Sequence, residues 1–135
     1  MKTTLKFASL LLLSLFVSCS SDDDSGEQTP SELDQIQGEW IRVGGNNPAN
    51  NGMVINVNDN SGVVVTPAPA QPTGFTEGEV KWKEIVLQDG THYRYEELGS
   101  NGSYYPASLR FGVDDTLRIS VDAAPGDGYI QKWVR

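Results

Sequence analysis

The chain has 135 residues, with 10 basic and 18 acidic side chains and a formal net charge of −8. This length supports one small domain with a single core, and the acidic balance lacks the clustered positive charge that binds a phosphate backbone, so we expect no nucleic acid among its partners. Its single cysteine, Cys19, excludes a disulfide within the chain.

Residues 1–18 have the parts of a secretory signal peptide. Lys2 and Lys6 supply positive charge, and residues 7–17 form an apolar stretch. The 12 residues from 7 to 18 would span roughly 18 Å as a helix, which is too short for a hydrocarbon core of about 30 Å. We therefore expect this segment to be inserted and cleaved, and not to remain as a membrane anchor.

The run Leu15-Phe16-Val17-Ser18-Cys19 resembles the lipoprotein box of bacterial lipoproteins, in which the cysteine is acylated and becomes the new N-terminus. The resemblance implies lipid, including palmitate-type acyl chains, at Cys19. Each buried methylene contributes about 0.8 kcal/mol, and more than one chain gives stable anchoring. The alternative is an ordinary signal peptide with an incidental cysteine, although Phe16 is bulky where that peptidase needs a small residue.

Residues 19–32 form an acidic segment that we expect to be a disordered tether. Cleavage after residue 18 would leave 8 basic and 18 acidic residues, a net charge of −10, and five of those acids lie in this segment. It carries too little apolar surface to offset the entropy lost on ordering. Ser21, Asp22, Asp23 and Asp24 resemble the surface-export signal of Bacteroidota lipoproteins. A solvated spacer on a protein facing the periplasm is the alternative.

Eight short β-rich runs follow a single helical turn at residues 33–36. Turn residues separate the runs at regular spacing, which is typical of an all-β sandwich or barrel. Asp89-Gly90 and Asn101-Gly102 are the strongest hairpin signals because these pairs tolerate positive φ. Successive hairpins predict, for residues 33–135, a single up-and-down antiparallel β-barrel of about eight strands, since closure removes exposed sheet edges. The expected strands are residues 38–43, 53–57, 62–66, 79–87, 91–98, 105–113, 116–122 and 129–135.

Alternation along these strands predicts which side chains face the barrel interior. The alternation of apolar and polar residues is interrupted near Glu84, which predicts a β-bulge there. In the final strand the pattern leaves open whether the face of Trp133 or that of Val134 points inward. The expected inward set is Val80, Trp82, Leu109, Phe111, Val113, Leu117, Ile119 and Val121.

The first and last strands carry a pair of residues that antiparallel pairing would bring together. Gly38 and Trp40 open the first strand, and Arg135 follows the last, so Arg135 could reach the Trp40 ring in a cation–π contact of about 0.5–2 kcal/mol. The Gly-x-Trp opening, the β-meander and this basic residue resemble the lipocalins, specifically the small lipocalin-like domains of bacterial lipoproteins. The resemblance implies that Trp40 plugs the closed end of the barrel and Arg135 covers it.

A second resemblance concerns whole stretches of the chain. Residues 44–49, 97–105 and 131–135 look like those of uncharacterised exported lipoproteins of Bacteroidota. Such proteins have no established activity, so this second resemblance implies nothing about function.

Two sets of residues are candidates for ligand contact. By the lipocalin resemblance, the loop after the first strand overhangs the barrel mouth, so its asparagines could be rim contacts to a small apolar ligand. They are Asn46, Asn47, Asn50 and Asn51, and turn-forming asparagines are the alternative. Tyr104 and Tyr105 cannot both point inward, and an exposed tyrosine combines a flat apolar face with a polar tip, suited to a glycan or a protein surface.

No motif predicts catalysis, a metal or a cofactor. His92 is the only histidine, and we expect it to be solvent-exposed because Arg94 and Glu96 share its face of the strand. Residues 56–62 alternate oxygen-bearing side chains but lack the later glutamate of a calcium loop, so we expect a hairpin turn.

Together these patterns predict a non-enzymatic, lipid-anchored outer-membrane lipoprotein that faces the cell exterior. We expect a monomer whose partners are outer-membrane lipid, through acylated Cys19, and a small ligand in the barrel. A surface adhesion or glycan-binding module using Tyr104, Tyr105 and the asparagine-rich loops is the alternative function.

Overall fold

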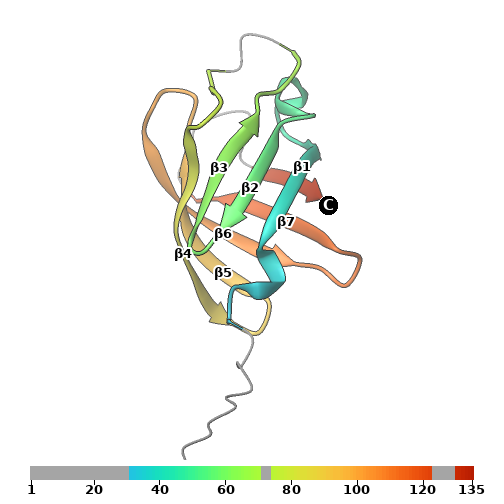
Figure 1. Ribbon diagram of the computed structural model, residues 1–135, viewed down its shortest axis with the longest axis vertical. Helices are drawn as coiled ribbons and strands as arrows, with labels where there is room; N and C mark the ends of the chain where they lie inside the picture. Colours follow the sequence, from blue (N-terminus) through green and yellow to red (C-terminus); the bar gives the residue numbers. More distant parts are fainter. Residues whose placement is uncertain (1–30, 71–73, 123–129) are drawn as a thin grey trace, which may run out of the picture.

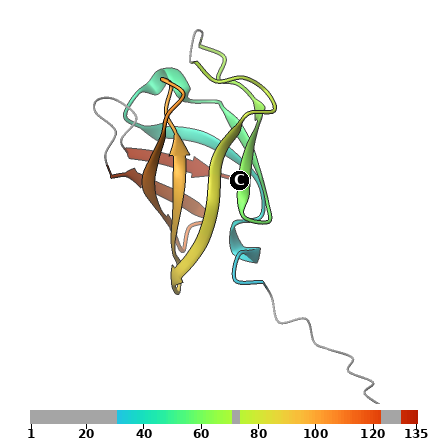
Figure 2. The ribbon, with the colours of Figure 1, turned by 90° about the vertical axis from the view of Figure 1, so that its left-hand side faces the viewer.

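Eight antiparallel strands form a closed barrel in the computed structural model, which describes residues 31–70, 74–122 and 130–135. Each strand pairs with its neighbour in sequence, and β8 pairs back with β1 (Figures 1 and 2). This confirms the predicted all-β, up-and-down barrel. The strands are β1 (Gly38–Gly45), β2 (Val54–Asn58), β3 (Ser61–Thr66), β4 (Val80–Asp89), β5 (His92–Leu98), β6 (Tyr104–Phe111), β7 (Thr116–Val121) and β8 (Ile130–Val134). Two short 3₁₀ turns accompany them, η1 (Asp34–Ile36) and η2 (Pro48–Asn50).

The pairing of β1 with β8 closes the barrel. Ile41 lies opposite Val134 and Gly45 opposite Gln131, with a register shift between Arg42 and Gly44. Gly45 has φ of +105°, and a Cβ atom there would lie 2.0 Å from the carbonyl oxygen of Ile130. Because no side chain fits in that space, only glycine allows β1 to lie this close to β8.

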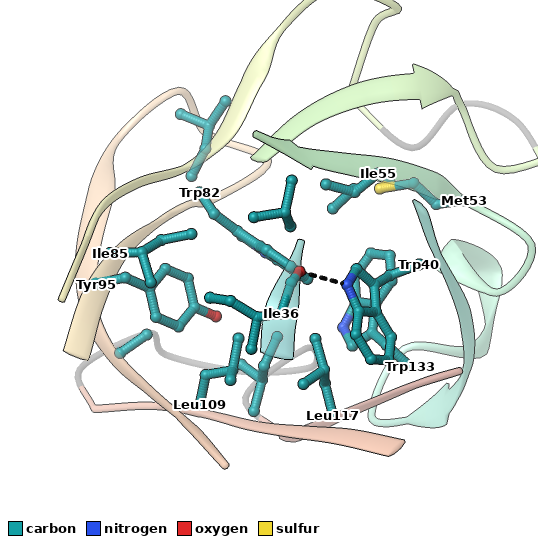
Figure 3. Packing of buried hydrophobic residues seen from close by; sticks show 14 of the residues in the cluster. Ile36, Trp40, Met53, Ile55, Trp82, Ile85, Tyr95, Leu109, Leu117 and Trp133 are labelled. Carbon is teal, nitrogen blue, oxygen red and sulfur yellow. Dashed lines mark hydrogen bonds between the residues drawn. The ribbon is translucent and has the colours of Figure 1, made fainter. Parts of the chain in front are cut away.

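At the end of the barrel at which β1 begins, η1 lies below the hairpin that joins β2 and β3 (Figure 2), and its residue Ile36 is fully buried. Trp40 is fully buried, and its indole Nε1 donates a hydrogen bond to the carbonyl oxygen of Ile36 at 2.8 Å (Figure 3). The Arg135 guanidinium lies 4.7 Å from the centre of the Trp40 ring and donates to the carbonyl oxygens of Gln35 and Gln37. Gly38, with φ of +98°, provides the backbone conformation that joins η1 to β1.

Large apolar side chains fill the middle of the barrel. Three tryptophans, Trp40, Trp82 and Trp133, are fully buried (Figure 3). The ring of Trp82 meets Trp133 and Tyr95 edge-on, at centroid distances of 5.1 and 5.8 Å. Close packing of this kind leaves little room for a ligand in this part of the interior.

Two members of the predicted inward set, Val80 and Val113, do not point inward. In β4, Trp82 lies opposite Gly62 and Val80 lies opposite the next residue of β3, so Lys81 is an extra residue in a bulge. The bulge buries both Lys81 and Trp82 and leaves Val80 37% exposed. Val113 lies beyond the end of β6 and is fully exposed.

The structure confirms other expectations about strand faces and decides the one question that alternation leaves open. The predicted irregularity near Glu84 is present, since that residue has φ of 56° and the register shifts between Lys83 and Val86. In β8 the inward face is that of Gln131 and Trp133. Phe111 is half-buried and meets Trp40 edge-on at 6.2 Å.

Replacing Trp40 with alanine should lower the free energy of unfolding by about 3–5 kcal/mol, because the change removes a large side chain from a closely packed interior. Urea denaturation measures this difference. Val113→Ala, a change at a fully exposed position, serves as the control and should stay within about 0.5 kcal/mol of the wild type. Equal losses in the two variants would contradict the role of Trp40 in sealing this end.

Candidate functional site

A partly open pocket of about 210 Å³ lies at the other end of the barrel, where β1, β3, β5 and β7 finish. Its lining comes from both the barrel interior and the connections around the mouth. The residues that line it are Arg42, Asn47, Asn50, Phe75, Lys81, Glu97, Leu98, Gly99, Ser100, Asn101, Tyr105, Val121 and Gln131.

The inner wall of the pocket is polar although it is buried. Arg42, Lys81, Glu97 and Gln131 are each no more than 3% exposed. Such groups are rarely buried unless they are paired, because removing charge and hydrogen-bonding capacity from water is costly. Their partners therefore decide what this site can do.

Strand alternation explains three of these four positions. Arg42 follows Trp40 by two residues in β1, and Glu97 follows Tyr95 by two residues in β5, so each shares the inward face of a buried aromatic residue. Gln131 precedes Trp133 by two residues in β8 and shares its inward face. The fourth, Lys81, points inward because of the bulge in β4.

Glu97 is the centre of a buried hydrogen-bond network. Its Oε1 accepts hydrogen bonds from the ammonium of Lys81 and from Gln131 Nε2, the latter at 2.8 Å. Its Oε2 accepts one from the Tyr95 hydroxyl at 2.9 Å. Burial, reinforced by the adjacent Glu97, raises the pKa of Tyr95 well above its ordinary value, so the phenol remains a donor.

Lys81 has partners on several sides. Besides Glu97, its Nζ donates to the carbonyl oxygen of Leu98 at 2.6 Å and lies 4.1 Å from the centre of the Phe75 ring. Burial lowers the pKa of Lys81 from its ordinary value, and the neighbouring Glu97 acts in the opposite direction. Lys81 and Glu97 thus form a buried ion pair, and both the ammonium of Lys81 and the carboxylate of Glu97 have further hydrogen-bond partners.

Arg42 is more weakly partnered. Its Nη2 donates to the carbonyl oxygen of Asn46 at 2.5 Å, whereas its Nε has no hydrogen-bond partner in the part of the chain that the structure describes. Burial lowers the pKa of Arg42 from its ordinary value, an effect that Glu97 and then Tyr95 oppose. Within residues 31–70, 74–122 and 130–135, no carboxylate lies within ion-pairing distance of its guanidinium.

The predicted ligand-contact residues divide into two groups. Asn47, Asn50 and Tyr105 line the pocket, whereas Asn46, Asn51 and Tyr104 do not. Asn46 instead accepts a hydrogen bond from the Ile130 backbone at 2.9 Å, helping to hold β1 against β8. The hydroxyl of Tyr104 donates to the carbonyl oxygen of Val80, so Tyr104 does not share a single platform with Tyr105.

The remaining predicted residues lie away from the pocket. Gly38, Trp40 and Arg135 are at the closed end, as described above. Cys19 and the acidic run Ser21, Asp22, Asp23 and Asp24 lie outside the described residues.

His92 lies at the closed end and is only partly exposed, because its neighbours cover part of the ring. Its Nδ1 is 2.7 Å from an Asp89 carboxylate oxygen, and the Arg110 Nε donates to its Nε2 at 2.5 Å.

The described part of the chain holds no group of three or more histidine, cysteine or acidic side chains placed to bind a metal ion. That part also contains no helix long and apolar enough to cross a membrane.

Comparison with known proteins identifies no relative: no family model, no curated protein and no solved structure matches this chain.

Replacing Glu97 with glutamine should lower the free energy of unfolding by about 3–5 kcal/mol, because Lys81 would be left as an unpaired buried charge. Adding Lys81→Met to this variant should restore most of the loss. The control is Glu96→Gln, which breaks the partly exposed Lys83–Glu96 ion pair and should cost no more than about 1 kcal/mol. Similar losses for Glu97→Gln and Glu96→Gln in urea denaturation would contradict the buried pairing.

Proposed function

We propose that this chain is a non-enzymatic, lipid-anchored, lipocalin-like protein of the outer membrane that holds one small ligand in the mouth of its barrel. The observation that carries the proposal is the division of the barrel interior. One end is filled by aromatic side chains, and the other contains a pocket of about 210 Å³ with a buried polar wall.

The pocket volume sets the size of the ligand. A buried cavity of about 150 Å³ holds benzene, and drug-sized ligands occupy about 300–1,000 Å³. A pocket of 210 Å³ therefore suits a molecule slightly larger than benzene. The buried charges favour a polar ligand over a wholly apolar one, because an apolar occupant would leave Arg42 Nε without a partner.

The state of Glu97 favours binding over catalysis. A general base must be free to accept a proton from a substrate, but both oxygens of Glu97 already accept hydrogen bonds from Lys81, Gln131 and Tyr95. His92 lies at the opposite end of the barrel from the pocket. This arrangement supports a site that holds a molecule without changing it.

The anchoring part of the proposal rests on the sequence. Acylation of Cys19 would place the barrel on the acidic segment 19–32, which is long enough to keep it clear of the lipid headgroups. Its export motif, Ser21 to Asp24, favours the outer surface of the cell.

Native mass spectrometry of the protein recovered from its host membranes should show one bound small molecule per chain. Val121→Phe should abolish this adduct, because Val121 lines the pocket and a larger side chain would fill it. Val65→Phe, on the outside of β3, makes the same substitution away from the pocket and should retain the ligand. A wild-type protein that carries no adduct and binds no small molecule would contradict the proposed function.

Protease added to intact cells should release the barrel from the cell surface. Replacing Asp22, Asp23 and Asp24 with alanine should protect it, because the export motif would be lost. The same three positions changed to glutamate preserve the negative charge and should keep the protein accessible. Equal protection of the wild type and the alanine variant would place the protein on the periplasmic side.

A further inference from the structure

We infer that the ligand of the mouth pocket is a small organic carboxylate whose negative charge is bound by Arg42. This inference rests on the function proposed above and names the chemical class of the ligand. Its basis is the charge balance of the pocket together with the unfilled hydrogen-bonding capacity of Arg42 and Asn50.

The described lining of the pocket has an excess of one positive charge. Its ionisable lining residues, among those described, are Arg42, Lys81, Glu97 and Tyr105. Lys81 and Glu97 are in direct contact, and the pair is neutral as a whole wherever the shared proton resides. Tyrosine is uncharged at neutral pH. The charge of Arg42 is therefore left without a compensating carboxylate in the described lining.

An unpaired buried guanidinium is a costly arrangement that a bound anion would relieve. Arg42 is only 1% exposed, and its Nε has no hydrogen-bond partner among the described residues. A guanidinium presents its N–H groups in a planar fork that matches the two oxygens of a carboxylate. Lys81 is less available for this role because Glu97 and Leu98 already accept its hydrogen bonds.

The rest of the pocket indicates what accompanies the carboxylate. Asn50 is 6% exposed, and no described residue donates a hydrogen bond to its side-chain oxygen, so a hydroxyl or N–H group on the ligand could do so. Phe75 and Leu98 supply an apolar wall nearby. A small hydroxy acid or a single-ring aromatic acid meets these conditions within 210 Å³.

Isothermal titration calorimetry with the full mature protein in detergent tests this inference directly. The probes are lactate and benzoate, each compared with its uncharged amide, lactamide or benzamide, and inorganic phosphate serves as a third anion. At least one carboxylate should bind the wild type about tenfold or more tightly than its amide, because the amide cannot balance the charge of Arg42.

Arg42→Met should weaken binding of that carboxylate at least about 30-fold, while leaving binding of the amide nearly unchanged. Arg118→Met is the matched control: Arg118 is more than half exposed on β7, and the change alters the net charge equally without touching the pocket. If Arg42→Met does not fold, Arg42→Lys replaces it. That variant keeps the positive charge but loses the planar N–H donors of the guanidinium, and it should still bind the carboxylate more weakly than the wild type.

Three results would overturn the inference. They are equal affinity for a carboxylate and its amide, binding of phosphate but of neither carboxylate, and carboxylate binding that is unaffected in both Arg42 variants. A neutral molecule recovered with the protein would overturn the carboxylate assignment while leaving the proposed small-ligand function intact. The absence of any recovered molecule, together with no binding of any probe, would instead reject the proposed function itself.

Discussion

The pairing of β1 with β8 is the constraint on which both ends of this barrel depend. At one end it brings Arg135 over the Trp40 ring, where the guanidinium also binds backbone carbonyl groups and seals the interior. At the other end it sets Arg42 opposite Trp133 and brings Gln131 beside the pocket. No disulfide can reinforce this closure, since the chain has one cysteine. The seal and the site are therefore held by the same ladder of hydrogen bonds, which requires glycine at position 45.

The two halves of the interior are stabilised in different ways. Apolar burial around the three tryptophans stabilises the closed half, whereas the mouth half contains an ion pair whose desolvation offsets much of its Coulombic gain. A fully apolar mouth of the same volume could be equally stable or more so. The network around Glu97 is better explained by positioning, because its partners hold the pocket wall in one arrangement. Arg42 lines the same pocket, and its Nε has no partner among the described residues. In this view, stability arises mainly at one end of the barrel, and the proposed ligand would be recognised at the other.

Sequence patterns predicted the architecture well because its signals are local. Turn residues and short β-rich runs located all eight strands, and successive hairpins predicted their order. The pocket was harder to predict, because charged residues are usually exposed and Arg42, Glu97 and Gln131 are buried. Alternation from Trp40 could have placed Arg42 inside once Trp40 was assigned to the interior. No comparable rule reveals Lys81, since the bulge that buries it, and that turns Val80 outward, depends on pairing with β3. Local patterns thus predicted the strands and the irregularity near Glu84, whereas the bulge at Lys81 and the buried charges depend on contacts between strands.

Closure by β1 and β8 also affects when the barrel can fold. The two strands lie about ninety residues apart along the chain, and contacts between such distant segments form slowly because the loop entropy must be lost first. Neither the Trp40 seal nor the mouth pocket can exist until β8 is available to pair. A chain that is exported N-terminus first would therefore cross the membrane with its barrel still open, in a form compatible with passage through a narrow channel. Competence for ligand binding would then arise only after export, which confines recognition to the compartment in which the protein is proposed to act.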